Sequence, residues 1–263
     1  MTSQALIRIS LLDGAPADPG GDVPVPGLGL QLQDHATDGL PEGVVTLEWI
    51  EHTEAYADGE PVQLRAPRVT VRLADGSSLP GDVRSSYRQA QAVFGLGLLE
   101  AVPDGTLRAL ADPDDADGDG ISGRPNRVWD PISGTVKLGR FGWKANQPGL
   151  EQQNAGAFLG DIGITSALFP DENCPAPQAE CAGAITGGKP ELDGDKLADT
   201  TYYSRLLAVP ARRAYDDPAV LRGKAVFRGA GCASCHTPML VTAAGGEMPE
   251  LAGQVIRPYT DLL

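Results

Sequence analysis

The sequence predicts an α+β, loop-rich fold, in which a small N-terminal antiparallel β region precedes a mainly helical region. Three observations carry this prediction. Apolar residues alternate with polar ones in residues 5–12 and 68–73, which is typical of half-buried strands. From Ser85 onward the apolar residues recur at three- and four-residue spacing instead. The chain also contains 33 Gly and 22 Pro among 263 residues, so we expect many turns and loops.

The β region is predicted over residues 1–83. Its first strand places Ile7, Ile9 and Leu11 on one face, and residues 68–73 repeat this pattern. Residues 44–49 form a third and weaker candidate strand. Gly- and Pro-rich connections between these segments favour antiparallel pairing.

A second, helical and loop-rich region is predicted over residues 84–210. Tyr87, Ala90, Phe94 and Leu98 would lie on one face of a helix. We expect further helices to start at Pro148 and near Asp195. The stretch 95–100 contains two glycines but lacks the third glycine of a nucleotide-binding loop, so we interpret these glycines as permitting close helix packing.

The third region, residues 211–263, begins with a predicted helix. Asp217 can cap it, and Pro218 suits its first turn. Apolar residues then recur at helical spacing, and Gly229 and Gly231 end the helix. It leads directly into the five residues 232–236.

Residues 232–236 form the pattern C-x-x-C-H, by which haem is bonded covalently to a polypeptide. In this interpretation Cys232 and Cys235 form thioethers with the two haem vinyl groups, and His236 is the proximal iron ligand. The alternatives are a thioredoxin-like redox pair, which requires a βαβ context, and half of a zinc site, which requires a second ligand pair. Neither context is visible in the sequence, so we favour haem c, one in this chain.

The formal net charge of −14 argues against nucleic acid as a partner, because phosphate contacts need clustered Lys and Arg. An acidic surface would attract a basic redox partner instead. No run of about eighteen apolar residues is present, so we predict no membrane span. Covalent haem attachment is an export-side chemistry, whereas Met1 does not begin a signal peptide. We therefore expect a periplasmic or otherwise exported protein whose signal, and further chain at both ends, lie outside this sequence.

An acidic loop matches the first half of a calcium-binding loop. Asp115, Asp117 and Asp119 occupy its positions 1, 3 and 5, and Ile121 would offer a backbone carbonyl at position 7. Position 12 is Asn126 rather than Glu, which predicts weaker binding. The alternative is a solvated acidic turn, because Asp and Gly are common in loops.

Two further features are tied to the expected compartment and cofactor. Cys174 and Cys181 could form a local disulfide in an oxidising compartment, with free buried thiols as the alternative. The second axial ligand of the haem is expected beyond Leu263, because none of the internal candidates suits the role. These candidates are Met239, Met248, His35 and His52.

Residues 139–145 place an aromatic side chain between two cations. Trp143 could act as an electron relay at a haem edge, although packing in the core is the simpler interpretation. Arg140 and Lys144 could neutralise haem propionates, or could be unpaired surface charges.

Taken together, these segments resemble the di-haem oxidoreductases similar to bacterial cytochrome c peroxidases, which are also labelled thiol oxidoreductases. The resemblance runs nearly end to end. Its carriers are residues 30–34, 95–100, 112–124, 139–145, 207–210 and 232–236. It implies an exported protein with two c-type haems, of which one accepts electrons and the other could reduce peroxide, and a small redox protein or cytochrome as the electron donor.

The chain contains one C-x-x-C-H, whereas the family carries a second one upstream, so residues 1–83 would be the remnant of an N-terminal haem domain. The sequence therefore predicts an exported c-type haem oxidoreductase that transfers electrons through the haem at Cys232, Cys235 and His236, with peroxide reduction expected of the full-length protein. Two alternatives are an electron carrier without turnover and a structural module stabilised by calcium or haem.

Overall fold

A computed structural model describes residues 5–37, 39–174 and 178–263. It divides the chain into two compact units. Unit 1 comprises Met1–Ala17, Asp22–Ala90 and Asn173–Thr186, and unit 2 comprises Asp18–Gly21, Gln91–Glu172 and Gly187–Leu263. The three-region division expected from the sequence stays a prediction.

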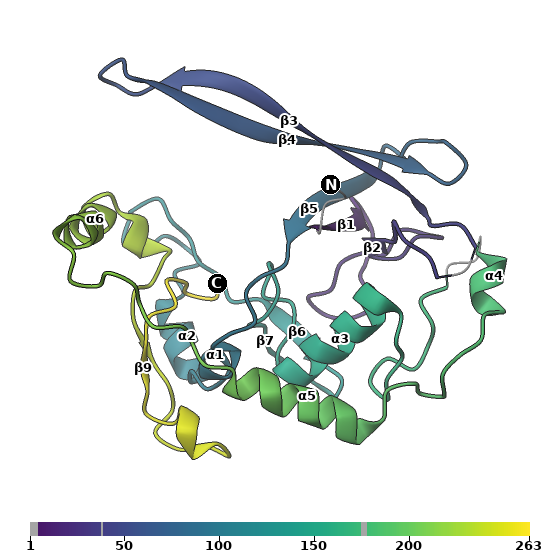
Figure 1. The fold of residues 1–263 in the computed structure, drawn as a ribbon. Coiled ribbons are helices and arrows are strands. Elements are labelled where there is room, and N and C mark those ends of the chain that lie inside the picture. Colours follow the sequence, from purple (N-terminus) through teal and green to yellow (C-terminus); the bar gives the residue numbers. More distant parts are fainter. Residues whose placement is uncertain (1–4, 38, 175–177) are drawn as a thin grey trace. The chain divides into compact units, whose positions relative to one another are not determined.

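Unit 1 is built on two antiparallel sheets (Figure 1). One has the order β2-β1-β5 and comprises β1 (Ala5–Leu11), β2 (Gln31–Leu32) and β5 (Val83–Gln89). The other is a long hairpin of β3 (Gly43–Ala55) and β4 (Pro61–Leu73). The short helix α4 (Ala179–Ala182) belongs to the same unit.

The core of unit 1 follows the predicted alternation of β1. Ile7 and Ile9 are 3% and 2% exposed, and they pack with buried Val25, Leu32 and Val71. Val71 comes from the end of the hairpin next to the β1 sheet, so this end is held by the core. The three strands expected in residues 5–12, 44–49 and 68–73 are thereby confirmed, within longer strands in the last two cases.

The helix predicted from Ser85 onward is wrong over its first part. Residues 83–89 form β5, in which Tyr87 pairs with Ile7 of β1 and packs against the unit 1 core. Helix α1 (Leu96–Glu100) begins only after Gly95, which has a left-handed φ of 72°. Pairing along the whole of β1 satisfies the backbone hydrogen bonds of this segment, and this outweighs its local helical periodicity.

Among the described residues, unit 2 contains five α-helices and two hairpins. Its helices are α1, α2 (Asp104–Leu110), α3 (Leu150–Ile162), α5 (Gly194–Leu206) and α6 (Pro218–Gly229). The hairpins pair β6 (Arg127–Asp130) with β7 (Thr135–Leu138), and β8 (Leu240–Val241) with β9 (Val255–Ile256). The helices expected at Pro148, near Asp195 and after Asp217 are confirmed.

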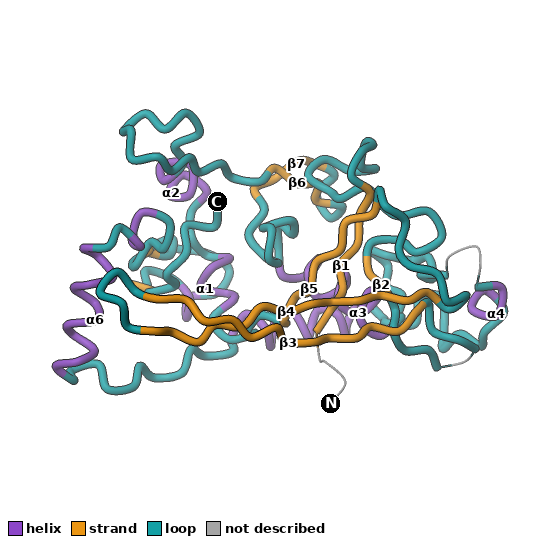
Figure 2. Tube along the Cα trace, turned by 90° about the horizontal axis from the view of Figure 1, so that it is seen from above, coloured by secondary structure: helices purple, strands orange, loops and turns teal. Residues whose placement is uncertain are grey.

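Loops connect these elements over much of the chain (Figure 2). The fold is therefore a mixture of α and β elements, as expected, but unit 2 is not mainly helical. The low aromatic content, 5% of the residues, leaves few large side chains to hold long helices together. Two small clusters form its core instead, one around Val102, Leu107 and Leu138 and one around Ala155 and Leu197.

Helix α1 lies against α5 at the position of Gly97 (Figure 1). A Cβ atom at residue 97 would overlap the backbone of Arg205. Glu100, at the end of α1, accepts hydrogen bonds from Nε of Arg205 at 2.6 Å and from the backbone N of Leu150 at 2.9 Å. The predicted role of these glycines in close packing is confirmed, and Glu100 joins α1 to α5 and to the start of α3.

Candidate haem-attachment site

Helix α6 delivers the C-x-x-C-H residues. Its N-terminus is capped by Asp217, whose carboxylate accepts a hydrogen bond from the backbone N of Ala219 at 2.7 Å, with Pro218 in the first turn. The helix ends before Gly231, which adopts a left-handed φ of 77°. Glycine suits this conformation because it has no Cβ to clash. The turn leads directly into a 3-10 helix, Cys232–Ser234.

The two cysteines and the histidine of the motif form one compact turn. The backbone N of His236 donates to the carbonyl of Cys232 at 2.9 Å. The thiols of Cys232 and Cys235 are free and exposed. Both sulfurs are therefore accessible for the two thioether bonds that covalent haem attachment requires.

The imidazole of His236 has a defined tautomer. Its Nδ1 lies 3.0 Å from the carbonyl oxygen of Tyr259. A carbonyl can only accept, so Nδ1 donates this hydrogen bond, and in the neutral imidazole Nε2 then carries the lone pair that can bind a metal. A histidine that donates from one nitrogen to a backbone carbonyl and binds a metal through the other is the usual arrangement at metal sites.

The ring of Phe227 lies beside this imidazole, and the ring of Tyr259 packs against Phe227 in turn. The ring of Phe227 on α6 lies 6.1 Å from that of His236 and 5.5 Å from that of Tyr259, the second contact being edge-to-face at 87°. Tyr259 has a φ of 54°, a left-handed conformation that costs a non-glycine residue free energy. The residue whose carbonyl accepts from His236 is therefore held in a strained backbone conformation.

The surface beside the motif fits a large apolar group. Helix α6 has no buried residue, although it carries several apolar side chains. Leu221 and Val226 are 50% and 68% exposed. A haem bonded to Cys232 and Cys235 would remove part of this apolar surface from water, which is favourable. The free thiols, the fixed tautomer and the uncovered apolar helix therefore fit a c-type haem.

The described residues do not support the two alternatives for the C-x-x-C pair. The motif follows a helix rather than a strand, unlike a thioredoxin-like pair. The one group of three or more potential metal-ligating residues in the described ranges is made of Asp112, Asp115 and Asp117, so no second ligand pair for zinc lies near Cys232 and Cys235 there.

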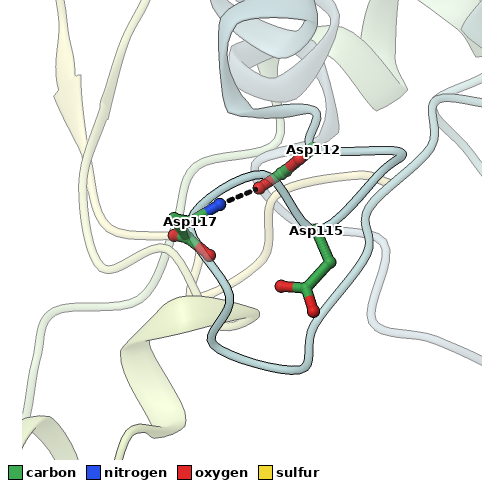
Figure 3. Close-up of side chains that lie close together, drawn as sticks. All are labelled: Asp112, Asp115 and Asp117. Atoms are coloured by element: carbon green, nitrogen blue, oxygen red, sulfur yellow. Dashed lines mark hydrogen bonds between the residues drawn. The ribbon is translucent and has the colours of Figure 1, made fainter.

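The acidic loop brings together part of the predicted ligand set (Figure 3). Carboxylate oxygens of Asp112, Asp115 and Asp117 all lie within 4.8 Å of one another. Asp119 is not in this group, and its Oδ1 accepts from the backbone N of Ile121 at 2.8 Å. Asp112 was not predicted, although it stands only three residues before Asp115. Calcium binding, including a role for Ile121, stays a prediction.

Asp112 also shapes the loop. Both of its carboxylate oxygens accept from the backbone N of Ala116 at 2.9 Å. One of them also accepts from the backbone N of Asp117 at 3.4 Å, the bond drawn in Figure 3. Oδ1 of Asp115 accepts from Gly120 at 3.1 Å. Carboxylate oxygens are the preferred ligands of calcium, and three in one turn repel one another without a cation.

Cys174 and Cys181 form a disulfide in the structure, with their Cα atoms 5.5 Å apart. The bridge lies in unit 1, apart in sequence from the haem-attachment motif. Residues 175–177 within its loop lie outside the described residues. The bridge closes a short loop, so its effect on stability is local.

The simpler expectations were a buried Trp143 and an exposed, unpaired Arg140, and the structure differs from both. Trp143 is 56% exposed, so it does not pack in the core of unit 2, and its role as an electron relay stays a prediction. Arg140 is neither exposed nor placed to meet a propionate. Its guanidinium is buried and donates to the carbonyls of Leu99 and Val102 at 3.0 and 2.7 Å and to Asp104 at 2.6 Å.

The internal candidates for a second axial ligand are dispersed. His35 and His52 belong to unit 1, and His35 contacts Asp34 at 2.7 Å. Met239 is 56% exposed. Met248 lines a cavity of about 270 Å³ together with Glu100 and Arg205. In this cavity the pairing with Glu100 raises the pKa of Arg205.

A helix that leads into two free thiols and a histidine with Nδ1 bonded to a carbonyl fits the covalent attachment of a haem. Comparison with known families supports a haem protein. A family model described as "Di-haem oxidoreductase, putative peroxidase" matches residues 23–263. The chain therefore belongs to the di-haem oxidoreductase family, and the resemblance noted from the sequence is confirmed. No curated protein and no solved structure was found to match the chain.

Among the described residues, no helix is both long enough and apolar enough to cross a bilayer.

Proposed function

We propose that this protein is an exported c-type haem oxidoreductase that transfers electrons through a haem held by Cys232, Cys235 and His236. The observation that carries the proposal is the hydrogen bond from Nδ1 of His236 to the Tyr259 carbonyl, because it leaves Nε2 free to bind iron. Membership of the di-haem oxidoreductase family supports the same reaction class.

Each residue of the site has a separate task. The sulfurs of Cys232 and Cys235 would hold the haem through thioether bonds, and Nε2 of His236 would be its proximal ligand. The Tyr259 carbonyl holds the imidazole tautomer, and Phe227 restricts rotation of the ring. When bound, the haem supplies one-electron chemistry at its iron.

We propose peroxide reduction as the reaction of the full-length di-haem protein. One molecule of hydrogen peroxide takes up two electrons and two protons and gives two molecules of water. A small redox protein or cytochrome supplies the electrons, one at a time. The second haem of the family would share this two-electron task with the haem at His236.

The disulfide in unit 1 supports an exported location, periplasmic or beyond. Disulfides persist in oxidising compartments and are rare in the cytosol, and Cys174 and Cys181 are paired here. The same compartment is the one in which haem is attached covalently to C-x-x-C-H motifs.

Stopped-flow absorbance of the haem-loaded protein tests the proposal. After reduction, the proposed oxidoreductase should be reoxidised by hydrogen peroxide at a rate that rises with peroxide concentration, and should catalyse repeated oxidation of a reduced cytochrome. Reduction and reoxidation by protein partners without any reaction with peroxide would overturn the peroxidase part and leave an electron carrier.

A further inference from the structure

The segment that carries the haem-attachment motif is opposite in charge to the rest of the chain. Residues 211–236 contain five Lys and Arg against two Asp, which gives +3. Because the whole chain carries −14, the remaining residues carry −17. We call four of these cations the basic patch. They are Arg212, Arg213, Lys224 and Arg228. The fifth cation, Arg222, stands two residues before Lys224 on α6 and therefore lies on another side of the helix.

The charges of the basic patch are not neutralised within the part of the chain that the structure describes. None of their side chains makes an ion pair or a hydrogen bond there. All except Lys224 are exposed. By contrast, Arg140 and Arg205 of the same unit are paired with Asp104 and Glu100. The patch therefore presents unpaired positive charge to solvent.

The basic patch lies beside the residues of the haem-attachment site. Arg212 and Lys224 line a cavity of about 250 Å³ together with Phe227 and Tyr259. Phe227 contacts the imidazole of His236 through its ring, and Tyr259 contacts it through its backbone carbonyl. Arg228 is four residues, about one turn, after Lys224 on α6, so these two cations share a side of the helix.

We propose that the basic patch is the docking surface for a small acidic redox protein that exchanges electrons with the haem at His236. The proposal rests on the proposed function, since it assigns the partner of that same site. In each encounter the reduced partner loses one electron and the haem gains one. The net charge of the chain alone predicts a basic partner, but the charge at the point of exchange decides how a partner docks.

The composition of the chain favours an acidic protein over an anionic membrane. Oppositely charged patches steer protein partners into a productive orientation and raise the association rate. A lipid surface is far larger than the basic patch, so its field also acts on the rest of a chain whose net charge is −14. Such a surface would repel most of this chain, whereas a small protein can contact the patch alone.

A binding experiment with paired charge-reversal variants tests this proposal. The probe is plant-type ferredoxin, a small acidic iron–sulfur protein, and binding to the haem-loaded protein is measured by surface plasmon resonance. The test variant is Arg212→Glu with Arg228→Glu, two exposed arginines of the basic patch. The matched control is Arg68→Glu with Arg127→Glu, two exposed arginines outside the patch whose reversal changes the net charge by the same amount.

The test variant should raise the Kd for ferredoxin about tenfold or more, since two charge contacts become repulsive. The control should change the Kd about twofold or less. Binding should also weaken between low and physiological ionic strength, where the Debye length falls to about 8 Å. An equal loss in both variants, or no ferredoxin binding by the haem-loaded protein, would overturn the proposal.

Two further measurements separate the possible failures. If phosphatidylglycerol vesicles bind through the same arginines while ferredoxin does not, the patch is a membrane site and the proposal is wrong. The haem content of each sample is measured first by its absorbance spectrum. Protein without covalent haem would contradict the proposed function itself. Haem-loaded protein that does not bind ferredoxin would contradict only the proposed docking surface.

Discussion

Replacing Arg140 with Met should destabilise unit 2 strongly. The buried guanidinium of Arg140 donates to the carbonyl oxygens of Leu99 and Val102, at the end of α1, and to Asp104, at the start of α2. Methionine fills a similar volume but donates no hydrogen bond. The Leu99 and Val102 carbonyls would lose this donor, and the buried part of the ion pair would be broken.

The size of the loss follows from these contacts. Hydrogen bonds to charged groups contribute about 1.5–3 kcal/mol each, and Asp104 counts for less because half of its side chain is exposed. Breaking a buried charge pair costs about 3–5 kcal/mol in other proteins. We therefore expect a loss of about 3–5 kcal/mol in the free energy of unfolding, or about 10 °C in Tm for a unit of this size.

Urea unfolding followed by circular dichroism at the helical wavelength measures this loss. The signal reports mainly on unit 2, because α1, α2, α3, α5 and α6 all belong to it. The control is Arg127→Met, which removes an exposed guanidinium and should change stability by less than about 0.5 kcal/mol. Arg140→Lys should fall between the two, since a single ammonium cannot reach three acceptors in a fork. Equal midpoints for Arg140→Met and Arg127→Met would refute the reasoning.

Three further predictions concern packing, pH and metal. Gly97→Ala should destabilise unit 2 by about 2–3 kcal/mol in thermal unfolding, because the new Cβ meets the Arg205 backbone. Gly105→Ala in α2, where the new Cβ meets open space, should stabilise the unit by about 0.5–1 kcal/mol. The same sign for both variants would be inconsistent with the α1–α5 contact. Burial opposes ionisation of Asp130, but hydrogen bonds from Lys137, Ser133 and the backbone N of Ile132 outweigh it and hold its pKa below the ordinary value. The stability from this carboxylate is therefore present above pH of about 4 and is lost as the pH falls through the lowered pKa. The difference in Tm between wild type and Asp130→Asn should shrink in that range. A difference in Tm that stays constant with pH would contradict the lowered pKa. Calcium should raise the Tm of chelator-treated protein. The double variant Asp115→Asn with Asp117→Asn should abolish this rise, whereas the control Asp58→Asn with Asp75→Asn should keep it. An unchanged Tm of the wild type on adding calcium would contradict calcium binding by this loop.

The parts of the site that are local in sequence could be predicted, because their chemistry depends on neighbouring residues. Cys232, Cys235 and His236 are fixed by their spacing, and the helix before them by Asp217 and Pro218. Tyr259 could not be found in this way. It stands 23 residues after His236, and it acts through its backbone carbonyl, which every residue possesses.

The errors arose where tertiary contacts outweigh local patterns. The periodicity around Tyr87 resembles a helix, yet pairing with β1 makes this segment a strand. Arg140 stands in a glycine-flanked turn of the sequence. Its side chain is nevertheless buried, because it contacts the residues at the end of α1 and at the start of α2. Asp112 stands three residues before Asp115, and in a loop this spacing does not by itself predict a contact. Only the fold of the loop brings their carboxylates together.

The most direct test of covalent haem binding removes pairs of thiols. The protein is expressed with a cytochrome c maturation system, and haem that survives a denaturing gel is detected by staining and quantified as the pyridine haemochrome. Cys232→Ser with Cys235→Ser should eliminate covalent haem, whereas Cys174→Ser with Cys181→Ser, which removes the same number of cysteines at the disulfide, should retain it. Wild-type protein without covalent haem, or haem that persists in the first variant, would contradict the central claim.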